Sequence, residues 1–145
     1  MDLTSKVYTS FSGINAFDKI KVLDFFGQND SRSNNENLDA SISAALKTVP
    51  SFGGLIITLC NSEEIMAAAI INFTGMTPYF PFSFITHVAI AKNQENQQAL
   101  TDLLIECING QLQDNFGILL KTTHPLYKLL RASSMKEKGR FLSSN

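Results

Sequence analysis

His87 has the clearest potential for acid–base chemistry in this sequence. It lies in the apolar segment Ile85-Thr86-His87-Val88-Ala89-Ile90, which has the composition of a buried strand. A neutral imidazole can take a proton from an ammonium group, or from a bridging water molecule, near neutral pH. His87 is therefore a candidate general base. The alternative is a histidine that is hydrogen-bonded within its strand and has no chemical role.

The segment after His87 passes from a predicted strand through a short polar loop into a long helix. The strand covers residues 84–91, and apolar residues recur at helical spacing over residues 94–112. Backbone N–H groups in the first turn of a helix have no partner within the helix, and the helix dipole adds partial positive charge there. Such a junction can hold a phosphate or pyrophosphate, although many similar junctions bind nothing.

The size and composition of the chain predict one globular domain, residues 1–145. The chain is 44% hydrophobic and 17% charged, which excludes a disordered, collagen-like or coiled-coil protein. No apolar run approaches the roughly 18 residues that a membrane span needs. The first residues do not have the pattern of a secretory signal, so we expect a cytoplasmic protein without membrane contacts.

Hydrophobic patterning predicts an α/β (α+β) domain with the element order β-α-α-β-β-β-α-β-α-β. Hairpins in the middle of the chain, followed by one crossover, indicate a mixed sheet with helices on its faces. Ile14, Phe17, Ile20, Leu23 and Phe26 are expected to form the core face of the first helix. The predicted strands are residues 3–9, 55–60, 65–73, 84–91, 116–122 and 139–143, and the predicted helices are residues 11–26, 38–49, 94–112 and 125–135.

Two loops have compositions that leave more than one interpretation open. The aromatic loop at residues 79–82 either lines an acceptor pocket or partner surface, or fills space under the sheet. The polar loop at residues 27–35 is a connector by composition alone.

The formal net charge of −1 conceals an uneven distribution. Residues 1–120 carry six basic and twelve acidic side chains, a balance of −6, whereas residues 121–145 carry six basic and one acidic, a balance of +5. This basic end either attracts an anionic partner, such as a phosphorylated cofactor, or is a solvated face. The acidic body argues against nucleic-acid binding.

The two cysteines, Cys60 and Cys107, have neither the spacing nor the neighbouring histidine of a metal site. No zinc or other metal site is therefore expected, nor a disulfide in a reducing compartment. Cys107 shares a helical stripe with apolar residues, which is typical of a small core residue.

The element order and the junction after His87 resemble the GNAT superfamily of N-acetyltransferases. In that family a strand core L-x-V leads to the loop Q/R-x-x-G-x-G/A, whose amides hold the pyrophosphate of acetyl-coenzyme A. Here Val88-Ala89-Ile90 is similar to the strand core, and Gln94-Glu95-Asn96-Gln97-Gln98-Ala99 falls on the loop motif. Gln97 replaces the middle glycine, and its side chain can obstruct a close approach to the diphosphate.

The resemblance implies acetyl-coenzyme A as co-substrate, bound in a V-shaped opening where the two central parallel strands splay. Backbone groups of Val88, Ile90 and Ala91 would pair with the pantetheine arm. Lys92 and the basic end of the chain are further candidates for the coenzyme phosphates. The loop amides that would meet the diphosphate are those of Gln94, Glu95, Asn96, Gln97, Gln98 and Ala99.

Two catalytic residues follow from the same resemblance. His87 lies near the position where family members often carry a glutamate as general base. Tyr127 begins the helix after the fifth long strand, where the family often has a tyrosine as general acid toward the leaving thiolate. The usual Tyr-x-x-x-Gly-Phe is here Tyr127-Lys128-Leu129-Leu130-Arg131-Ala132. The alternative is that Tyr127 packs its ring against the sheet. His124 is a further possible ligand contact or a surface histidine.

We therefore predict transfer of an acetyl group from acetyl-coenzyme A to an unidentified primary amine on a small molecule or a peptide. The alternative is a catalytically degenerate GNAT-like module that binds a ligand or a protein, which Gln97 and the incomplete tyrosine motif favour. Pairing of strand edges near residues 139–143 would allow a homodimer.

Overall fold

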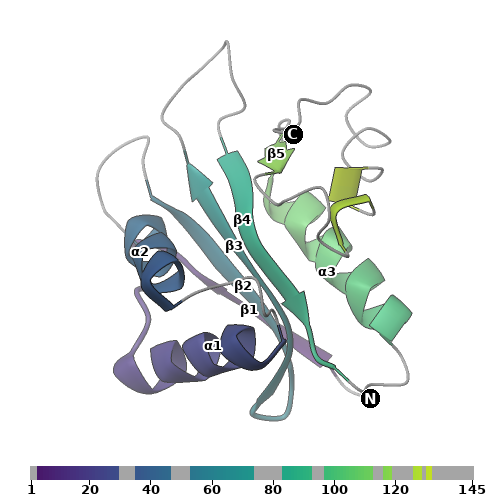
Figure 1. Ribbon diagram of the computed structural model, residues 1–145, viewed down its shortest axis with the longest axis horizontal. Coiled ribbons are helices and arrows are strands. Elements are labelled where there is room, and N and C mark those ends of the chain that lie inside the picture. Colours follow the sequence, from purple (N-terminus) through teal and green to yellow (C-terminus); the bar gives the residue numbers. More distant parts are fainter. Residues whose placement is uncertain are drawn as a thin grey trace.

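A mixed five-stranded sheet, with the strand order β1-β2-β3-β4-β5, forms the centre of the computed structural model (Figure 1). The structure describes residues 3–29, 35–46, 53–73, 83–92, 97–112, 116–118, 126–128 and 130–131. Its elements are β1 (Leu3–Tyr8), α1 (Ala16–Asn29), α2 (Asn35–Ala45), β2 (Gly54–Asn61), β3 (Glu64–Phe73), β4 (Ser83–Ile90), α3 (Gln97–Gln111) and β5 (Phe116–Ile118).

The fold class and the first eight elements of the predicted order are confirmed. Tyr127, Lys128, Leu130 and Arg131 are helical, as expected for the last helix. The predicted last strand at residues 139–143 lies outside the described residues, as do the aromatic loop at residues 79–82 and His124.

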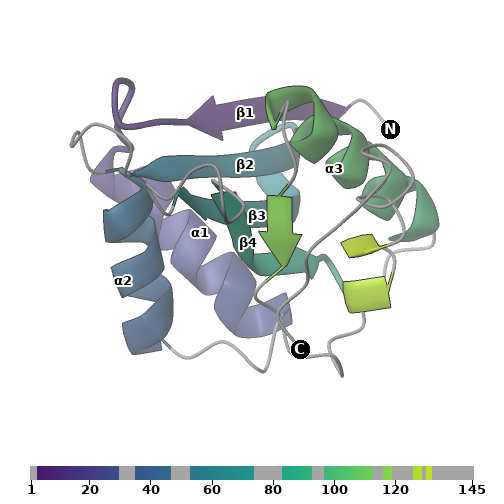
Figure 2. The same cartoon turned by 90° about the horizontal axis from the view of Figure 1, so that it is seen from above.

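Helices cover both faces of the sheet. Strands β1 to β4 are antiparallel, and β5 runs parallel to β4. Helices α1 and α2 lie on one face and α3 on the other (Figures 1 and 2). Because β2 and β3 are covered on both sides, their residues from Leu55 to Cys60 and from Met66 to Ile71 are buried without alternation. This explains the continuous apolar runs in the sequence.

The predicted core face of the first helix is wrong in part. Phe11, Phe17 and Ile20 are 98%, 68% and 57% exposed. Phe26 is buried as predicted, but the other buried residues of the helix are Val22 and Phe25. Three residues turn a helix by only about 300°, so a stripe that advances in steps of three drifts around the helix and leaves the core.

Local hydrogen bonds explain where α1 begins. Ser12 and Thr9 form a tight turn with reciprocal bonds, and Gly13 has a positive φ of 64°. The Asn15 side chain then accepts a hydrogen bond from the Asp18 N–H at 2.7 Å, which caps the helix. The helix therefore begins at Ala16 rather than at Phe11.

The carboxyl end of α1 also differs from the prediction. The helix extends to Asn29, three residues into the stretch that the sequence assigned to a loop. The Asn29 side chain donates a hydrogen bond to the Phe25 carbonyl at 2.9 Å and so satisfies a carbonyl of the last turn.

Strand β4 contains a β-bulge at its centre. Ile70 of β3 pairs with His87, but the next residue, Ile71, pairs with Ile85, so Thr86 is an extra residue. A bulge bends its strand and increases the local twist. Among the described residues, β5 pairs with β4 over Ser83–Ile85, directly before the bulge.

Among the described residues, no helix is both long and apolar enough to cross a membrane.

Candidate functional site

The bulge in β4 places His87 on the sheet face that α1 and α2 cover. The imidazole meets the Phe26 ring of α1 edge to face, with 6.0 Å between the ring centroids and 75° between the planes. Its Nδ1 lies 3.3 Å from Thr86 Oγ1. Adjacent residues of a regular strand point to opposite faces, whereas here both side chains turn to the same face because Thr86 is the extra residue.

A row of polar groups connects His87 to α2. Thr86 Oγ1 lies 2.6 Å from Asn72 Oδ1 of β3 and 3.2 Å from the Ile70 carbonyl oxygen. Asn72 Nδ2 donates a hydrogen bond to the Ser41 carbonyl of α2 at 3.0 Å. All three side chains are partly buried, so these hydrogen bonds replace water that the polar groups have lost.

The peptide groups of β4 differ in the direction they face. Ala91 N–H donates to the Met66 carbonyl at 2.8 Å, so Ala91 and Met66 are a hydrogen-bonded pair. In an antiparallel ladder such pairs alternate with pairs whose N–H and C=O groups point away from the partner. By this alternation the peptide groups of Val88 and Ile90 point away from β3, toward the side of β5. The Ala91 N–H does not, because β3 uses it.

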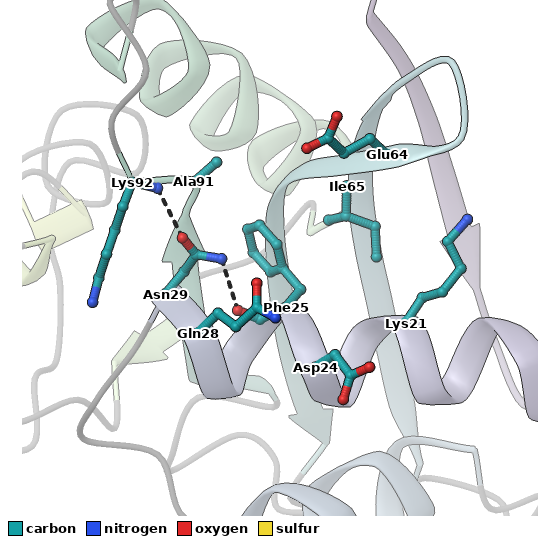
Figure 3. Close-up of a pocket in the computed structure, with 9 residues that line it drawn as sticks. All are labelled: Lys21, Asp24, Phe25, Gln28, Asn29, Glu64, Ile65, Ala91 and Lys92. Carbon is teal, nitrogen blue, oxygen red and sulfur yellow. Dashed lines mark hydrogen bonds between the residues drawn. The ribbon is translucent and has the colours of Figure 1, made fainter.

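Two side-chain amides fix the segment between β4 and α3. The Asn29 side chain accepts a hydrogen bond from the Lys92 N–H at 2.8 Å, while it also bonds to Phe25 (Figure 3). Gln97 Nε2 donates to the Ala91 carbonyl at 2.9 Å. These two hydrogen bonds connect the end of β4 to the last residue of α1 and to the first residue of α3.

The amino end of α3 contributes only part of the predicted phosphate loop. Gln97, Gln98 and Ala99 form its first turn, where backbone N–H groups have no partner within a helix. The first turn contains no acidic residue, so nothing in it offsets the partial positive charge of the helix dipole. Gln94, Glu95 and Asn96 lie outside the described residues.

A cavity of about 330 Å³ lies between α1, the start of β3 and the end of β4 (Figure 3). Its charged lining residues are Lys21, Asp24, Glu64 and Lys92. Lys21 is engaged, since its Nζ donates to the Glu63 carbonyl and lies 5.4 Å from the centre of the Phe17 ring. Because the positive and negative charges balance, this cavity offers no net attraction for a diphosphate.

Tyr127 packs within the hydrophobic core together with Leu130. Its predicted role as general acid and the alternative that its ring packs against the sheet both stay predictions.

The thiol of Cys60 is buried and that of Cys107 is partly buried. Burial raises the pKa of the Cys107 thiol, with a smaller contribution from the nearby Glu106 charge. A thiol that stays protonated is a poor nucleophile. Among the described residues, no group of three or more His, Cys, Asp or Glu side chains could hold a metal ion.

Sequence patterns did not identify Asn29, Asn72 or Thr86 as parts of this site. Asn72 carried a usable signal, because a polar side chain near the end of a long apolar strand needs a hydrogen-bond partner when it is shielded from water. Thr86 carried none, since its contacts depend on the register between β3 and β4.

Solved structures of acetyltransferases have the same fold. A possible acetyltransferase from Clostridium difficile 630 matches with a TM-score of 0.59 at 8% identity, covering 99% of this chain and 93% of that one. An aminoglycoside acetyltransferase from an uncultured soil metagenomic sample, solved with sisomicin, has a TM-score of 0.59 at 11% identity, with the same coverage. The ribosomal-protein-S18-alanine N-acetyltransferase from Escherichia coli has a TM-score of 0.55 at 10% identity, covering 90% of this chain and 76% of that one.

Sequence comparisons add no closer relationship. No protein-family model and no curated protein sequence matches the chain. The element order and the structural matches together lead to one conclusion: this chain has the fold of the GNAT-superfamily N-acetyltransferases.

Proposed function

We propose that the protein is an N-acetyltransferase that moves an acetyl group from acetyl-coenzyme A to a primary amine carried by a small molecule or a peptide. The fold supports acetyl transfer in general terms. The observation that carries the proposal is the bulge in β4. It turns the His87 imidazole to the α1–α2 face, while the Val88 and Ile90 peptide groups point toward β5.

The residues around β4 fit the parts of acetyl-coenzyme A. Peptide groups of Val88 and Ile90 can pair with the amide groups of the pantetheine arm as a strand would. The first-turn N–H groups of Gln97, Gln98 and Ala99 suit the diphosphate, and the Lys92 ammonium is available to a further phosphate. The Ala91 N–H is used by β3, so we assign the pantetheine pairing to Val88 and Ile90.

Each of the two proton transfers has its own residue: His87 accepts the proton of the amine, and Tyr127 donates a proton to the thiolate. Acetyl-coenzyme A supplies a thioester, whose carbonyl carbon accepts a nucleophile. His87 takes a proton from the ammonium form of the acceptor, directly or through water, and so frees the nitrogen lone pair. As the new C–N bond forms and the C–S bond breaks, backbone N–H groups of β4 stabilise the charge on the carbonyl oxygen. Tyr127 then gives its proton to the departing thiolate.

Direct transfer needs no acyl-enzyme. The raised thiol pKa of Cys107 and the burial of Cys60 agree with this, because neither side chain is prepared to act as a nucleophile.

A binding module without catalysis is the second candidate, and one contact favours it. Gln97 stands where the resemblance has a glycine, and its side chain bonds to the Ala91 carbonyl beside the proposed diphosphate site. In this case the fold holds a ligand or a protein but transfers no acetyl group.

Isothermal titration of the purified protein with acetyl-coenzyme A tests the proposal. We expect saturable heat with a stoichiometry of one, because the amino end of α3 and the β4 edge offer one site. Gln97→Gly should raise the affinity if the glutamine obstructs the diphosphate, and Gln98→Gly, which changes the neighbouring residue in the same turn, is the matched control.

Absence of heat at millimolar acetyl-coenzyme A would contradict the enzyme proposal. Binding without release of free coenzyme A in the presence of any of a panel of amines would favour the second candidate.

A further inference from the structure

We propose that Asn29 is a positioning residue for the acetyl-coenzyme A site. It holds the peptide group that joins Ala91 to Lys92 out of the plane of the sheet, and so ends the coenzyme-pairing edge of β4 at Ile90. This inference rests on the proposed function, in which the outward peptide groups of β4 bind the pantetheine arm. Asn29 is not expected to touch the coenzyme, so it acts through the backbone of Lys92.

The alternation along β4 predicts where the Lys92 N–H would point in a longer strand. The Ala91 N–H donates to the Met66 carbonyl of β3, so in a regular strand the residues on either side of Ala91 turn their peptide groups away from β3. Ile90 is one of these residues, and Lys92 is the other. A straight continuation of β4 would therefore add the Lys92 N–H to the row that Val88 and Ile90 present toward β5.

The structure has a different course at Lys92. Strand β4 ends at Ile90, and Lys92 lies in a turn. The Lys92 N–H donates to Asn29 Oδ1, the last residue of α1, at 2.8 Å (Figure 3). Helix α1 covers a face of the sheet and does not lie beside β5 (Figures 1 and 2). The hydrogen bond therefore takes the Lys92 N–H out of the row that faces β5.

The same peptide group is held at its other end by α3. The Ala91 carbonyl belongs to the peptide group that carries the Lys92 N–H, and it accepts a hydrogen bond from Gln97 Nε2 at 2.9 Å. In a trans peptide group the C=O and N–H bonds point in opposite directions. Helices α1 and α3 lie on opposite faces of the sheet, so one helix holds each end of this group. The peptide group thus crosses the plane of the sheet, whereas the peptide groups of a strand lie within it.

The Asn29 carboxamide is oriented by both of its partners. The Phe25 carbonyl only accepts hydrogen bonds, so the Asn29 NH₂ faces it at 2.9 Å. The Lys92 N–H only donates, so it requires the Asn29 oxygen. Because both partners require the same orientation, the hydrogen bond to Phe25 holds the oxygen where it receives the Lys92 N–H.

The turned peptide group determines where the coenzyme leaves β4. Val88 and Ile90 can pair with the amide groups of the pantetheine arm, and the outward row ends directly after them. The next donors for the coenzyme are the first-turn N–H groups of α3, which begins at Gln97. Asn29 therefore helps to set the spacing between the edge that binds pantetheine and the turn that binds the diphosphate.

Amide hydrogen exchange measures the contact without any ligand. The Lys92 amide of ¹⁵N-labelled protein should exchange about fivefold or more faster in Asn29→Ala than in the wild type, because one hydrogen bond to the protein is lost. The Ala91 amide, which bonds to Met66, should keep its rate. Gln28→Ala changes the exposed neighbour of Asn29 in the same helix and is the matched control, with no change expected at Lys92. A wild-type rate at Lys92 in Asn29→Ala, or an equal acceleration at Ala91, would overturn the inference.

Isothermal titration provides the second measurement. Asn29→Ala should weaken the binding of acetyl-coenzyme A about tenfold, because the diphosphate and the pantetheine arm are no longer held at the right spacing. S-acetylpantetheine lacks the diphosphate and should bind the variant and the wild type equally. An unchanged affinity for acetyl-coenzyme A, or an equal loss for both donors, would overturn the role given to Asn29.

Failure of the proposed function has a different signature. A wild-type protein that binds neither donor would contradict the acetyl-coenzyme A site and, with it, the coenzyme role of Asn29. The exchange rates of the Lys92 amide would still decide whether Asn29 holds the turned peptide group.

Discussion

Replacing His87 with glutamine should lower kcat for acetyl transfer by about a hundredfold or more, because a positioned general base contributes roughly 10²- to 10⁴-fold to such reactions. Glutamine has a similar size and keeps hydrogen-bonding groups, but it cannot accept a proton near neutral pH. Acetyl-coenzyme A should bind the variant as tightly as it binds the wild type, since the proposed contacts come from backbone groups of β4 and α3. Steady-state kinetics together with isothermal titration measure both quantities.

Cys107→Ser is the control for this variant. Cys107 lies in α3, and its thiol has no role in direct transfer, so the variant should keep the wild-type kcat. If His87→Gln retains more than half of the wild-type kcat, His87 is not the base. A large loss in Cys107→Ser would instead indicate a covalent intermediate.

Replacing Gly54 with alanine should lower the free energy of unfolding by about 3 kcal/mol. Gly54 has a φ of 154°, which side chains other than hydrogen rarely allow. A methyl carbon there would lie 1.9 Å from the Ile71 carbonyl oxygen. That oxygen belongs to the backbone of β3, so it can move only if the pairing between β2 and β3 is disturbed. Urea denaturation followed by circular dichroism measures the change.

Gly110→Ala is the matched control for the stability measurement. Gly110 is in α3, and nothing lies within 4 Å of the position where its Cβ would be. Alanine there should raise the stability by about 0.5–1 kcal/mol, because glycine is a poor helix former. Equal stability of Gly54→Ala and the wild type would show that β3 does not approach β2 as closely as described.

Much of the fold could be predicted from the sequence, because hydrophobic patterning is set locally. The apolar runs of β2 and β3 and the turn between them were found correctly, since strands covered on both faces are apolar throughout. The core face of α1 was not. Steps of three residues from Ile14 to Phe26 look regular in the sequence but rotate around the helix, and the structure buries Val22 and Phe25 instead of Phe17 and Ile20.

Residue types in the sequence were enough to select candidate residues for the site, but they could not predict how those residues are arranged. His87 stood out because imidazole is suited to proton transfer, and the resemblance placed it beside the proposed coenzyme site. The extra residue Thr86 depends on the register between β3 and β4, which no local pattern records. The direction of each β4 peptide group also depends on that register, so Val88 and Ile90 could not be distinguished from Ala91 before the pairing was known.

The most direct test of the central claim is an NMR titration of the ¹⁵N-labelled protein with acetyl-coenzyme A, observed at the backbone amides of β4. We predict saturable shifts of the Val88 and Ile90 amides, together with those of Gln97 and Gln98 in the first turn of α3. The Ala89 and Ala91 amides, which face β3, should shift less and act as internal references. The proposal that this edge of β4 holds the acetyl donor would be contradicted if millimolar acetyl-coenzyme A left the amide signals of Val88 and Ile90 unchanged. It would also be contradicted if the only signals to shift came from the residues that line the cavity between α1, the start of β3 and the end of β4.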